Sequence, residues 1–427
     1  MLKIVSPQKE NWSQYLSRPQ QNQKDITQIV SDIFETVQLK GDVAIREYTN
    51  RFDGTEIENY AVCAEEILDA SAKVSDELKN AILLAKSNIE KFHLSQKTTK
   101  IEVETTEGVL CWQEKRPIQK VGLYIPGGTA PLFSTVLMLA IPAQIAGCQE
   151  VVLCSPPDKT GNIHPAILYA AALCGVTKIY KVGGIQAIAA MTLGTETVPK
   201  VYKIFGPGNQ YVTAAKQFAM QFGVAIDMPA GPSELLIFAD EFAVPAFVAS
   251  DLLSQAEHGI DSQVILVSTS KIIIDAVADE INIQIKKLPR QSIAEIAILN
   301  SKSIFLNTDE LSIELINEYA PEHLIICAKN EQFFIDNIQN AGSVFLGNYT
   351  PESAGDYASG TNHTLPTNGY ARNYSGVNLD SFLKAMTFQK ITQKGIKNIG
   401  KAIEIMAEAE GLQGHKNAVS LRLEYLK

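Results

Sequence analysis

The chain has 427 residues, 46% of them hydrophobic, and its 37 basic and 47 acidic residues give a net charge of -10 at pH 7. A single hydrophobic core stops growing below this length, so we expect at least two domains. The acidic balance argues against a nucleic-acid or membrane-surface partner and favours a small-molecule ligand.

The amino-terminal residues have no pattern typical of export. Met1 to Ser17 mixes charged and polar residues with isolated hydrophobic ones, so it lacks the apolar core of a signal peptide. The most apolar stretch, Pro131 to Cys148, is interrupted by Ser134 and Gln144 and falls short of the ~20 apolar residues that span a bilayer. We predict a buried helix there, no membrane span, and a cytoplasmic protein.

The first hundred residues have a helical pattern. From Asp25 to Phe92 apolar residues recur at spacings of three and four, which predicts amphipathic helices. Residues 101–104 and 109–112 are expected to form a short β region, and the Thr-Thr-Glu-Gly between them has the composition of a hairpin turn. An antiparallel hairpin is therefore expected after the helices.

Beyond Val121 short apolar runs alternate with helical stretches. We expect strands at 121–125, 151–154, 179–182, 201–205, 234–238, 264–267, 304–306, 323–327 and 344–346. Such alternation is typical of α/β units with largely parallel sheets that helices cover on both faces. At least two sheets are expected, with a seam at Met228 to Pro232.

The pattern stops from Gly347 to Val377, where Gly, Ser, Thr, Asn and Tyr dominate. A structureless segment of this length is usually functional or disordered, and the presence of Asp356 and His363 favours a functional role. After Leu379 the chain becomes helical and amphipathic to its end. This tail is too short and polar to fold alone, so we expect it to dock on another structure.

Four of the six histidines fall in the last two fifths of the chain, at positions 258, 323, 363 and 415. Because histidine both ligates transition metals and transfers protons near neutral pH, this clustering indicates a metal-assisted site. Gln255 and His258 are three residues apart at an expected helix end and can converge on one point. A polar surface pair or a satisfied core histidine is the alternative. Asp356 and His415 are candidates to complete a zinc site.

Glu322 and His323 follow Pro321, which ends the preceding helix, and they open an apolar run. A histidine beside a carboxylate can act as a general base pair that transfers protons and activates water. An ordinary solvated strand start is the alternative reading. Sites in α/β sheets usually lie at the carboxyl ends of strands, which argues against this placement.

Three glycine-rich turns follow expected strands, at 126–128, 183–184 and 206–209. Such turns let a pyrophosphate approach backbone amides at the start of a helix, but none of them completes a GxGxxG motif. The six cysteines are spread through hydrophobic segments without a CxxC pair, which favours reduced packing thiols. Cys148 and Cys154 are the best candidates for a catalytic thiol, yet nothing adjacent would activate a thiolate.

Seven motifs taken together resemble the histidinol dehydrogenase family, in the family's order and over almost the whole chain. They are Gly122 to Gly128, Phe205 to Asn209, Asp227 to Glu234, Ser254 to Gly259, Ala320 to Leu324, Ser353 to His363, and Gly414 to Ala418. The resemblance implies zinc-dependent, four-electron oxidation of L-histidinol to L-histidine through L-histidinaldehyde. It also implies two NAD per turnover and the last step of histidine biosynthesis.

The resemblance assigns roles to individual residues. The implied ligands of one Zn²⁺ per subunit are Gln255, His258, Asp356 and His415, and the implied NAD contacts are Tyr124, Gln186 and Asn209. The implied substrate contacts are the four zinc ligands with Ser233, His323, His363 and Glu410. His323 would transfer protons and Glu322 would activate water.

The expected fold is α/β, with two Rossmann-like domains, mainly parallel sheets, and small N-terminal and C-terminal helical segments that complete a homodimer. Residues 25–122 and 234–377 are expected to form the domain with the zinc and catalytic residues, and 123–233 the domain with the NAD contacts. Residues 1–24 form an N-terminal segment. Residues 378–427 would reach the partner subunit and bring Glu410 and His415 into its site.

Two alternatives remain. A paralogous zinc and NAD dehydrogenase could oxidise another small alcohol, although Glu410, an acid suited to an imidazole, favours histidinol. A metal-dependent binding or regulatory protein would have no turnover. The presence of both Glu322 and His323 argues against that second alternative.

Overall fold

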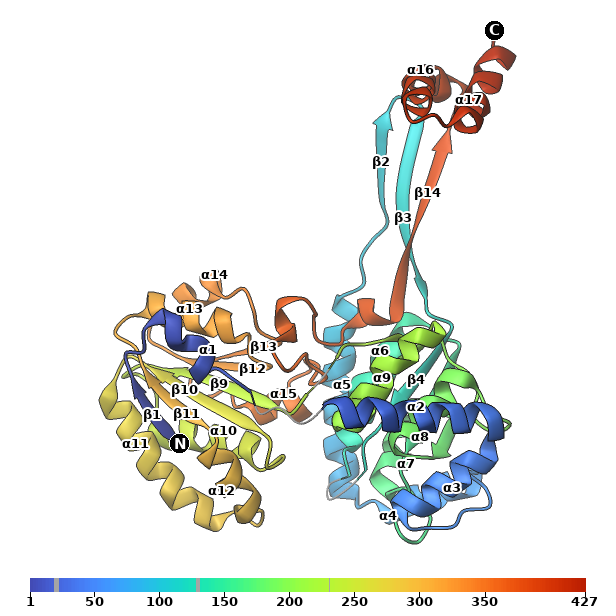
Figure 1. Ribbon diagram of the computed structural model, residues 1–427. Coiled ribbons are helices and arrows are strands. Elements are labelled where there is room, and N and C mark those ends of the chain that lie inside the picture. The colour runs from blue at the N-terminus through green and yellow to red at the C-terminus, as the bar shows by residue number, and fades with distance from the viewer. Residues whose placement is uncertain (19–22, 128–130, 230) are drawn as a thin grey trace.

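The computed structural model describes residues 1–18, 23–127, 131–229 and 231–427. Two parallel sheets, each covered by helices, form the body, and an antiparallel arm with two helices at its end projects from it (Figure 1). The expected α/β architecture with mainly parallel sheets is confirmed. Residues 19–22 of the N-terminal segment, Gly128 of the first glycine turn and Ala230 of the seam lie outside the described residues. None of the described helices is long and apolar enough to cross a membrane.

The first sheet has five parallel strands in the order β6-β5-β4-β7-β8. They are β4 (Lys120–Tyr124), β5 (Glu150–Ser155), β6 (Lys178–Lys181), β7 (Lys203–Phe205) and β8 (Ala225–Ile226). The first of these strands lies between the second and the fourth, as in doubly wound sheets. In such sheets the crevice at the carboxyl ends of the strands is the usual ligand site.

Helices cover both faces of the five-stranded sheet. One face packs against α4 (Ala64–Lys73), α5 (Asp76–Ser95), α6 (Phe133–Ala146) and α7 (Pro165–Leu173). The other packs against α2 (Gln23–Lys40), α3 (Asp42–Asp53), α8 (Gly184–Leu193) and α9 (Gln210–Ala219). The expected buried helix at 131–148 is α6, and its burial on nearly all sides explains a sequence without a polar face.

The packing of α2 to α5 differs from the expected grouping, which placed residues 25–122 with 234–377. Phe34 of α2 belongs to the same buried cluster as Ile188 of α8, and Ile89 of α5 packs with α6. These helices therefore cover the five-stranded sheet. Apolar periodicity identified the helices, but it does not show which sheet an apolar face covers.

The second sheet has six parallel strands in the order β1-β11-β10-β9-β12-β13. They are β1 (Leu2–Val5), β9 (Glu234–Ala239), β10 (Gln263–Ser268), β11 (Lys302–Phe305), β12 (His323–Cys327) and β13 (Ser343–Leu346). Strands β9, β10 and β12 are fully buried, as their continuous apolar runs predicted. Strand β1 was not expected, because three of its four residues are exposed at the edge of the sheet.

Helices also cover both faces of this second sheet. One face packs against α10 (Pro245–Ala256), α11 (Lys271–Gln284) and α12 (Gln291–Leu299). The other packs against α1 (Trp12–Tyr15), α13 (Asp309–Tyr319) and α14 (Glu331–Asn337). The segment 347–377, expected to lack regular structure, contains the short helix α15 (Glu352–Tyr357). This helix carries Asp356.

The arm consists of β2 (Ile101–Thr106), β3 (Val109–Pro117) and β14 (Leu383–Ile391), in the order β14-β3-β2, followed by α16 (Gln393–Ala409) and α17 (Gln413–Tyr425). The hairpin of β2 and β3 was predicted. Strand β14 was not, because the chain after Leu379 was expected to be helical. Most of β14 is exposed, so no alternation of apolar and polar residues marks it as a strand.

Phe382 anchors the arm to the body. Its side chain is fully buried, and its ring stacks on Phe205 of β7 with 4.0 Å between the ring centroids. Its carbonyl oxygen accepts a hydrogen bond from the amide of Ile118, at the other root of the arm. The arm is therefore held by the core of the five-stranded sheet.

We predict that Phe382→Ala lowers the free energy of unfolding by about 3–5 kcal/mol, because it leaves a cavity and removes the ring contact. Urea denaturation measures the change. Phe242→Ala is the control, since that side chain is 52% exposed, and it should cost about 0.5 kcal/mol or less. Equal losses in the two variants would contradict the anchoring role.

Candidate active site

Glu322 and His323 lie at the amino-terminal edge of the six-stranded sheet. Helix α13 is followed by Ala320, whose φ of 52° is left-handed, and β12 begins at His323. Strand β9 begins beside it at Glu234. The pair thus stands at a strand start, the position that the sequence analysis had considered less usual for a site.

His323 presents a buried proton acceptor. Its side chain is 4% exposed, and Nδ1 lies 3.3 Å from the carbonyl oxygen of Glu234. A proton on Nδ1 is donated to that oxygen, which leaves Nε2 as the acceptor. Nε2 has no hydrogen-bond partner among the described residues and lies 3.8 Å from Oδ1 of Asp356. Burial lowers the pKa of His323 to about 4, so the imidazole is neutral at pH 7.

Glu322 lies beside His323 and shares its support. The Glu234 amide donates a hydrogen bond of 2.8 Å to Oε2 of Glu322, and that oxygen lies 3.7 Å from Nδ1 of His323. Burial raises the pKa of Glu322 well above its ordinary range, and the hydrogen bond from the Glu234 amide opposes this rise. A carboxylate with a raised pKa is a stronger base toward water.

Helix α15 adds two carboxylates to this site. Glu352 is 1% exposed, and its Oε1, unpartnered within the described part of the chain, lies 3.7 Å from Nδ1 of His323. Burial raises the pKa of Glu352 well above its ordinary range, and the neighbouring charges of Asp356 and Glu322 add to the rise. Glu352 was not predicted as a site residue, since a single glutamate in an irregular segment carries no signal of burial.

Gln255 and His258 converge, as their spacing predicted. Nε2 of Gln255 lies 3.2 Å from Nδ1 of His258, and Oε1 of Gln255 is buried with no partner among the described residues. Helix α10 ends at Ala256, so His258 reaches this point from the following turn. Burial lowers the pKa of His258, against the opposing charge of Asp356. A neutral imidazole, an amide oxygen and a carboxylate are suited to hold zinc.

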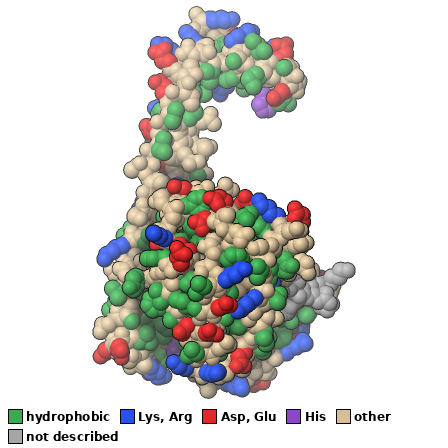
Figure 2. Space-filling view, turned by 90° about the vertical axis from the view of Figure 1, so that its left-hand side faces the viewer, with side chains coloured by type: hydrophobic (Ala, Val, Ile, Leu, Met, Phe, Trp, Pro, Cys, Tyr) green, Lys and Arg blue, Asp and Glu red, His purple; other side chains and the backbone are tan. Residues whose placement is uncertain are grey.

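His415 and Glu410 are not part of this cluster. Both are exposed at the end of the arm, where α16 and α17 stand far from the six-stranded sheet (Figure 1). Figure 2 shows that end of the arm projecting beyond the body. Within the described part of the chain, no three His, Cys, Asp or Glu side chains are arranged to hold a metal. One chain thus gathers three of the four expected ligands and carries the fourth elsewhere.

His363 uses both ring nitrogens inside the protein. Nδ1 lies 2.9 Å from the carbonyl oxygen of Asp356, and Nε2 lies 3.1 Å from Oγ1 of Thr135 in α6. The side chain therefore connects α15 to a helix of the other sheet. This geometry suits a residue that positions Asp356, and it leaves no ring nitrogen free for a substrate.

Arg18 and Glu234 form an ion pair that supports the site at the start of β9, and neither residue was predicted to have this role. The Arg18 guanidinium donates a 2.8 Å hydrogen bond to Oε2 of Glu234 and a 2.7 Å bond to the carbonyl oxygen of Tyr319, and it stacks on the Tyr319 ring at 4.0 Å. The Asn368 amide donates a hydrogen bond of 2.7 Å to Oε1 of Glu234. A charged pair 216 residues apart in sequence leaves no local pattern to detect.

A cavity of about 370 Å³ lies beside the cluster. Its lining includes Ser233, His258, Asn209 and Asn368. Ser233 and His258 belong to the six-stranded half of the molecule, whereas Asn209 begins α9 of the other half. The cavity therefore joins the proposed substrate and coenzyme residues.

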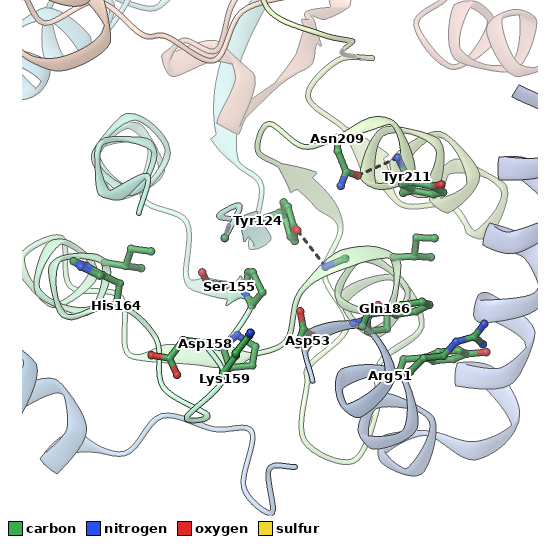
Figure 3. Close-up of a pocket in the computed structure, with 18 of the residues that line it drawn as sticks. Arg51, Asp53, Tyr124, Ser155, Asp158, Lys159, His164, Gln186, Asn209 and Tyr211 are labelled. Carbon is green, nitrogen blue, oxygen red and sulfur yellow. Dashed lines mark hydrogen bonds between the residues drawn. The ribbon is translucent and has the colours of Figure 1, made fainter. Parts of the chain in front are cut away.

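A larger cavity of about 1170 Å³ lies at the carboxyl ends of β4 and β5 and brings together Tyr124, Gln186 and Asn209 (Figure 3). The Tyr124 hydroxyl accepts a 3.1 Å hydrogen bond from the amide of Gly184, and Asn209 caps α9. Oε1 of Gln186 and Oγ of Ser155, both buried, have no partner among the described residues. Unsatisfied buried oxygens on a cavity wall indicate a polar ligand.

The cysteines do not contribute to this chemistry. All six are free, and burial raises the pKa of Cys148 to about 12 and that of Cys154 further still. A thiol that stays protonated near neutral pH is a poor nucleophile. The expectation of packing thiols is thus supported for these two residues.

The fold and the site define an α/β enzyme with a buried histidine and glutamate pair at the junction of two parallel sheets. A family profile described as histidinol dehydrogenase matches residues 16–423. The histidinol dehydrogenase of Bacteroides thetaiotaomicron is 59% identical over 428 residues, covering 100% of both chains, and that of Haemophilus influenzae is 55% identical over 412 residues, covering 96% of both. The crystal structure of histidinol dehydrogenase from Elizabethkingia anophelis has 60% identity and a TM-score of 0.98, covering 100% of this chain and 98% of that one.

The chain therefore belongs to the histidinol dehydrogenase family. The family name implies an oxidoreductase of histidine biosynthesis, and the resemblance of the seven motifs is confirmed.

Proposed function

We propose that the protein is a cytoplasmic enzyme that oxidises L-histidinol to L-histidine through L-histidinaldehyde, as the last step of histidine biosynthesis. It uses one zinc ion per subunit and two NAD in succession, and one water enters the product as a carboxylate oxygen. The observation that carries this proposal is the unpartnered Nε2 of His323, buried beside Glu322, in a chain of this family. One group can exchange protons and the other can activate water.

Gln255, His258 and Asp356 fit a zinc ion, with His415 of the partner as the fourth ligand. The fit rests on the unpartnered, buried Oε1 of Gln255 and on the lowered pKa of His258, which keeps its imidazole neutral. Zinc supplies a positive charge that holds the amino and hydroxyl groups of the substrate in a fixed orientation. The pairing of His323 Nδ1 with Glu234 keeps Nε2 directed to the same space.

His323 handles the proton in the first oxidation. Its Nε2 accepts the hydroxyl proton while the adjacent carbon gives up a hydride, for which NAD supplies the acceptor. A neutral imidazole is required at the start of this step. Burial provides it by lowering the pKa of His323 to about 4.

Glu322 acts before the second oxidation. Its carboxylate accepts a proton from water as the water oxygen bonds to the aldehyde carbon, and the protonated His323 gives its proton to the carbonyl oxygen. The resulting hydrate loses a second hydride, and His323 Nε2 again accepts the hydroxyl proton. His323 is thus used in both oxidations, whereas Glu322 is used only in the hydration between them.

The coenzyme is proposed to occupy the larger cavity through Tyr124, Gln186 and Asn209. The unpartnered Oε1 of Gln186 and Oγ of Ser155 support a polar ligand there. Asn209 also lines the smaller cavity with Ser233 and His258. A dinucleotide can therefore run from the carboxyl ends of β4 and β5 toward the substrate.

A homodimer with shared sites completes the proposal. Ile405, Met406 and Leu421 are 55%, 65% and 66% exposed at the end of the arm, which favours burial against a second chain. The arm would bring the partner's His415 to the zinc ligands and the partner's Glu410 to the substrate imidazole. Ser233 would contact the substrate from the receiving chain, and His363 would position Asp356.

We predict that the purified protein forms two NADH for each L-histidinol consumed, with L-histidine as the product. Absorbance of NADH together with chromatography of the product measures this ratio. A ratio of one, with accumulated aldehyde, would show a two-electron alcohol dehydrogenase instead.

Glu322→Gln should slow the oxidation of L-histidinaldehyde by roughly 10²–10⁴-fold and spare the oxidation of L-histidinol, because only the second half requires an activated water. Single-turnover measurements with each substrate separate the two halves. Glu241→Gln, which changes an exposed glutamate, is the matched control and should leave both rates unchanged. Equal losses in both halves for Glu322→Gln would assign this residue a different role.

A further inference from the structure

Asp53 occupies a position that neither its helix nor its packing explains. It is the last residue of α3, where the negative end of the helix dipole disfavours a carboxylate. Its Oδ2 is buried without a hydrogen-bond partner, and no salt bridge in the described part of the chain includes it. A carboxylate oxygen that is shielded from water and left unpaired lowers stability, so it points to a ligand that satisfies it.

Three unsatisfied oxygens surround the larger cavity. Oδ2 of Asp53, Oγ of Ser155 and Oε1 of Gln186 come from α3, β5 and α8, and each lacks a partner among the described residues. Figure 3 shows these side chains around the same space. Two of them can only accept hydrogen bonds when Asp53 is ionised, so the ligand must offer donors. The adjacent hydroxyl groups of a ribose meet this requirement.

Asp158 is another acid of this cavity that could bind a ribose, since doubly wound sheets often supply such an acid after an early strand. It follows β5 and lines the same cavity. Its Oδ1, however, accepts hydrogen bonds from the amides of Thr160 at 2.8 Å and Asn162 at 3.1 Å. Asp158 therefore holds its own turn together. The third acid of the lining, Asp32, is exposed and already accepts a hydrogen bond within its helix, so Asp53 is the acid left for a ligand.

The position of the two cavities indicates which ribose is involved. They share Asn209, and the smaller one contains Ser233 and His258, where the reacting end of a dinucleotide must lie. The larger cavity extends from Asn209 away from these residues, along α3 and β5. The half of the dinucleotide that does not react, adenosine, therefore occupies it.

We infer that Asp53 accepts hydrogen bonds from the ribose hydroxyls of the adenosine half of NAD and thereby excludes coenzymes with a 2′-phosphate. This inference rests on the proposed use of NAD. A 2′-phosphate would remove the donor and place its negative charge against the carboxylate. Burial raises the pKa of Asp53 to about 6, so the carboxylate is ionised at pH 8.

Kinetics with NAD and NADP at pH 8 test the inference. Asp53→Asn should raise the KM for NAD roughly 10–100-fold with little change in kcat, because it removes binding to a charged acceptor far from the reaction. Asp53→Ser, which also makes room, should lower the preference for NAD over NADP in kcat/KM by about tenfold or more. Asp279→Asn is the matched control, since Asp279 is an exposed aspartate of α11 that lines neither cavity.

Isothermal titration calorimetry of coenzyme binding, without L-histidinol, gives a second measurement that does not depend on turnover. In the wild-type enzyme, NAD that lacks the 2′-hydroxyl of its adenosine should have a raised Kd, similar to that of NAD with Asp53→Asn. In Asp53→Asn the analogue should cause little further rise, because the lost partner is the same. A structural defect in the variant would instead add to the effect of the analogue.

The outcomes separate this inference from the proposed function. If the wild-type enzyme reduces NAD and Asp53→Asn matches Asp279→Asn in its KM values and coenzyme preference, the role of Asp53 is refuted and the proposed function stands. If the wild-type enzyme does not reduce NAD with L-histidinol, the proposed function and this inference both fail.

Discussion

The buried ion pair between Arg18 and Glu234 is the interaction on which the proposed catalytic geometry depends. The amide of Glu234 holds the Glu322 carboxylate, and its carbonyl oxygen faces Nδ1 of His323. Arg18 supplies the positive charge that keeps the Glu234 carboxylate paired in a buried setting. Removal of one partner from such a pair lowers the free energy of unfolding by about 3–5 kcal/mol, because the other charge remains buried. The first segment of the chain thus supports a site made from distant residues.

The same fixed edge of the sheet is compatible with one site that serves both of the proposed half-reactions. A backbone oxygen fixes the tautomer of His323, and burial lowers the pKa of its imidazole and keeps it neutral. Burial raises the pKa of the neighbouring Glu322. The two groups need not move between the halves. The arm adds a different constraint. Phe382 fixes the base of the arm in the core of the five-stranded sheet, while His415 lies at the far end of the arm. The proposed set of zinc ligands is therefore complete only with a second chain.

The features that could be predicted from the sequence are those that a local pattern of residues marks. Continuous apolar runs identified buried strands such as β9 and β12, and the three-residue spacing of Gln255 and His258 predicted their convergence. The sequence did not predict β14, whose exposed residues carry no alternation, or the sheet that α2 to α5 cover. Nor did it identify Arg18, Glu352 or Asp53. Their burial is set by chain segments far away in sequence, which no single-residue pattern records.

A hybrid dimer tests the central claim, that each active site is built from two chains. A His323→Ala chain and a His415→Ala chain with different tags are refolded together, and dimers that carry both tags are isolated. One site of such a hybrid combines an intact His323 with the partner's intact His415, so the hybrid should recover about half of the wild-type activity while each parent variant stays inactive. If His415 serves its own chain, every site carries one defect, and the isolated hybrid will be as inactive as its parents.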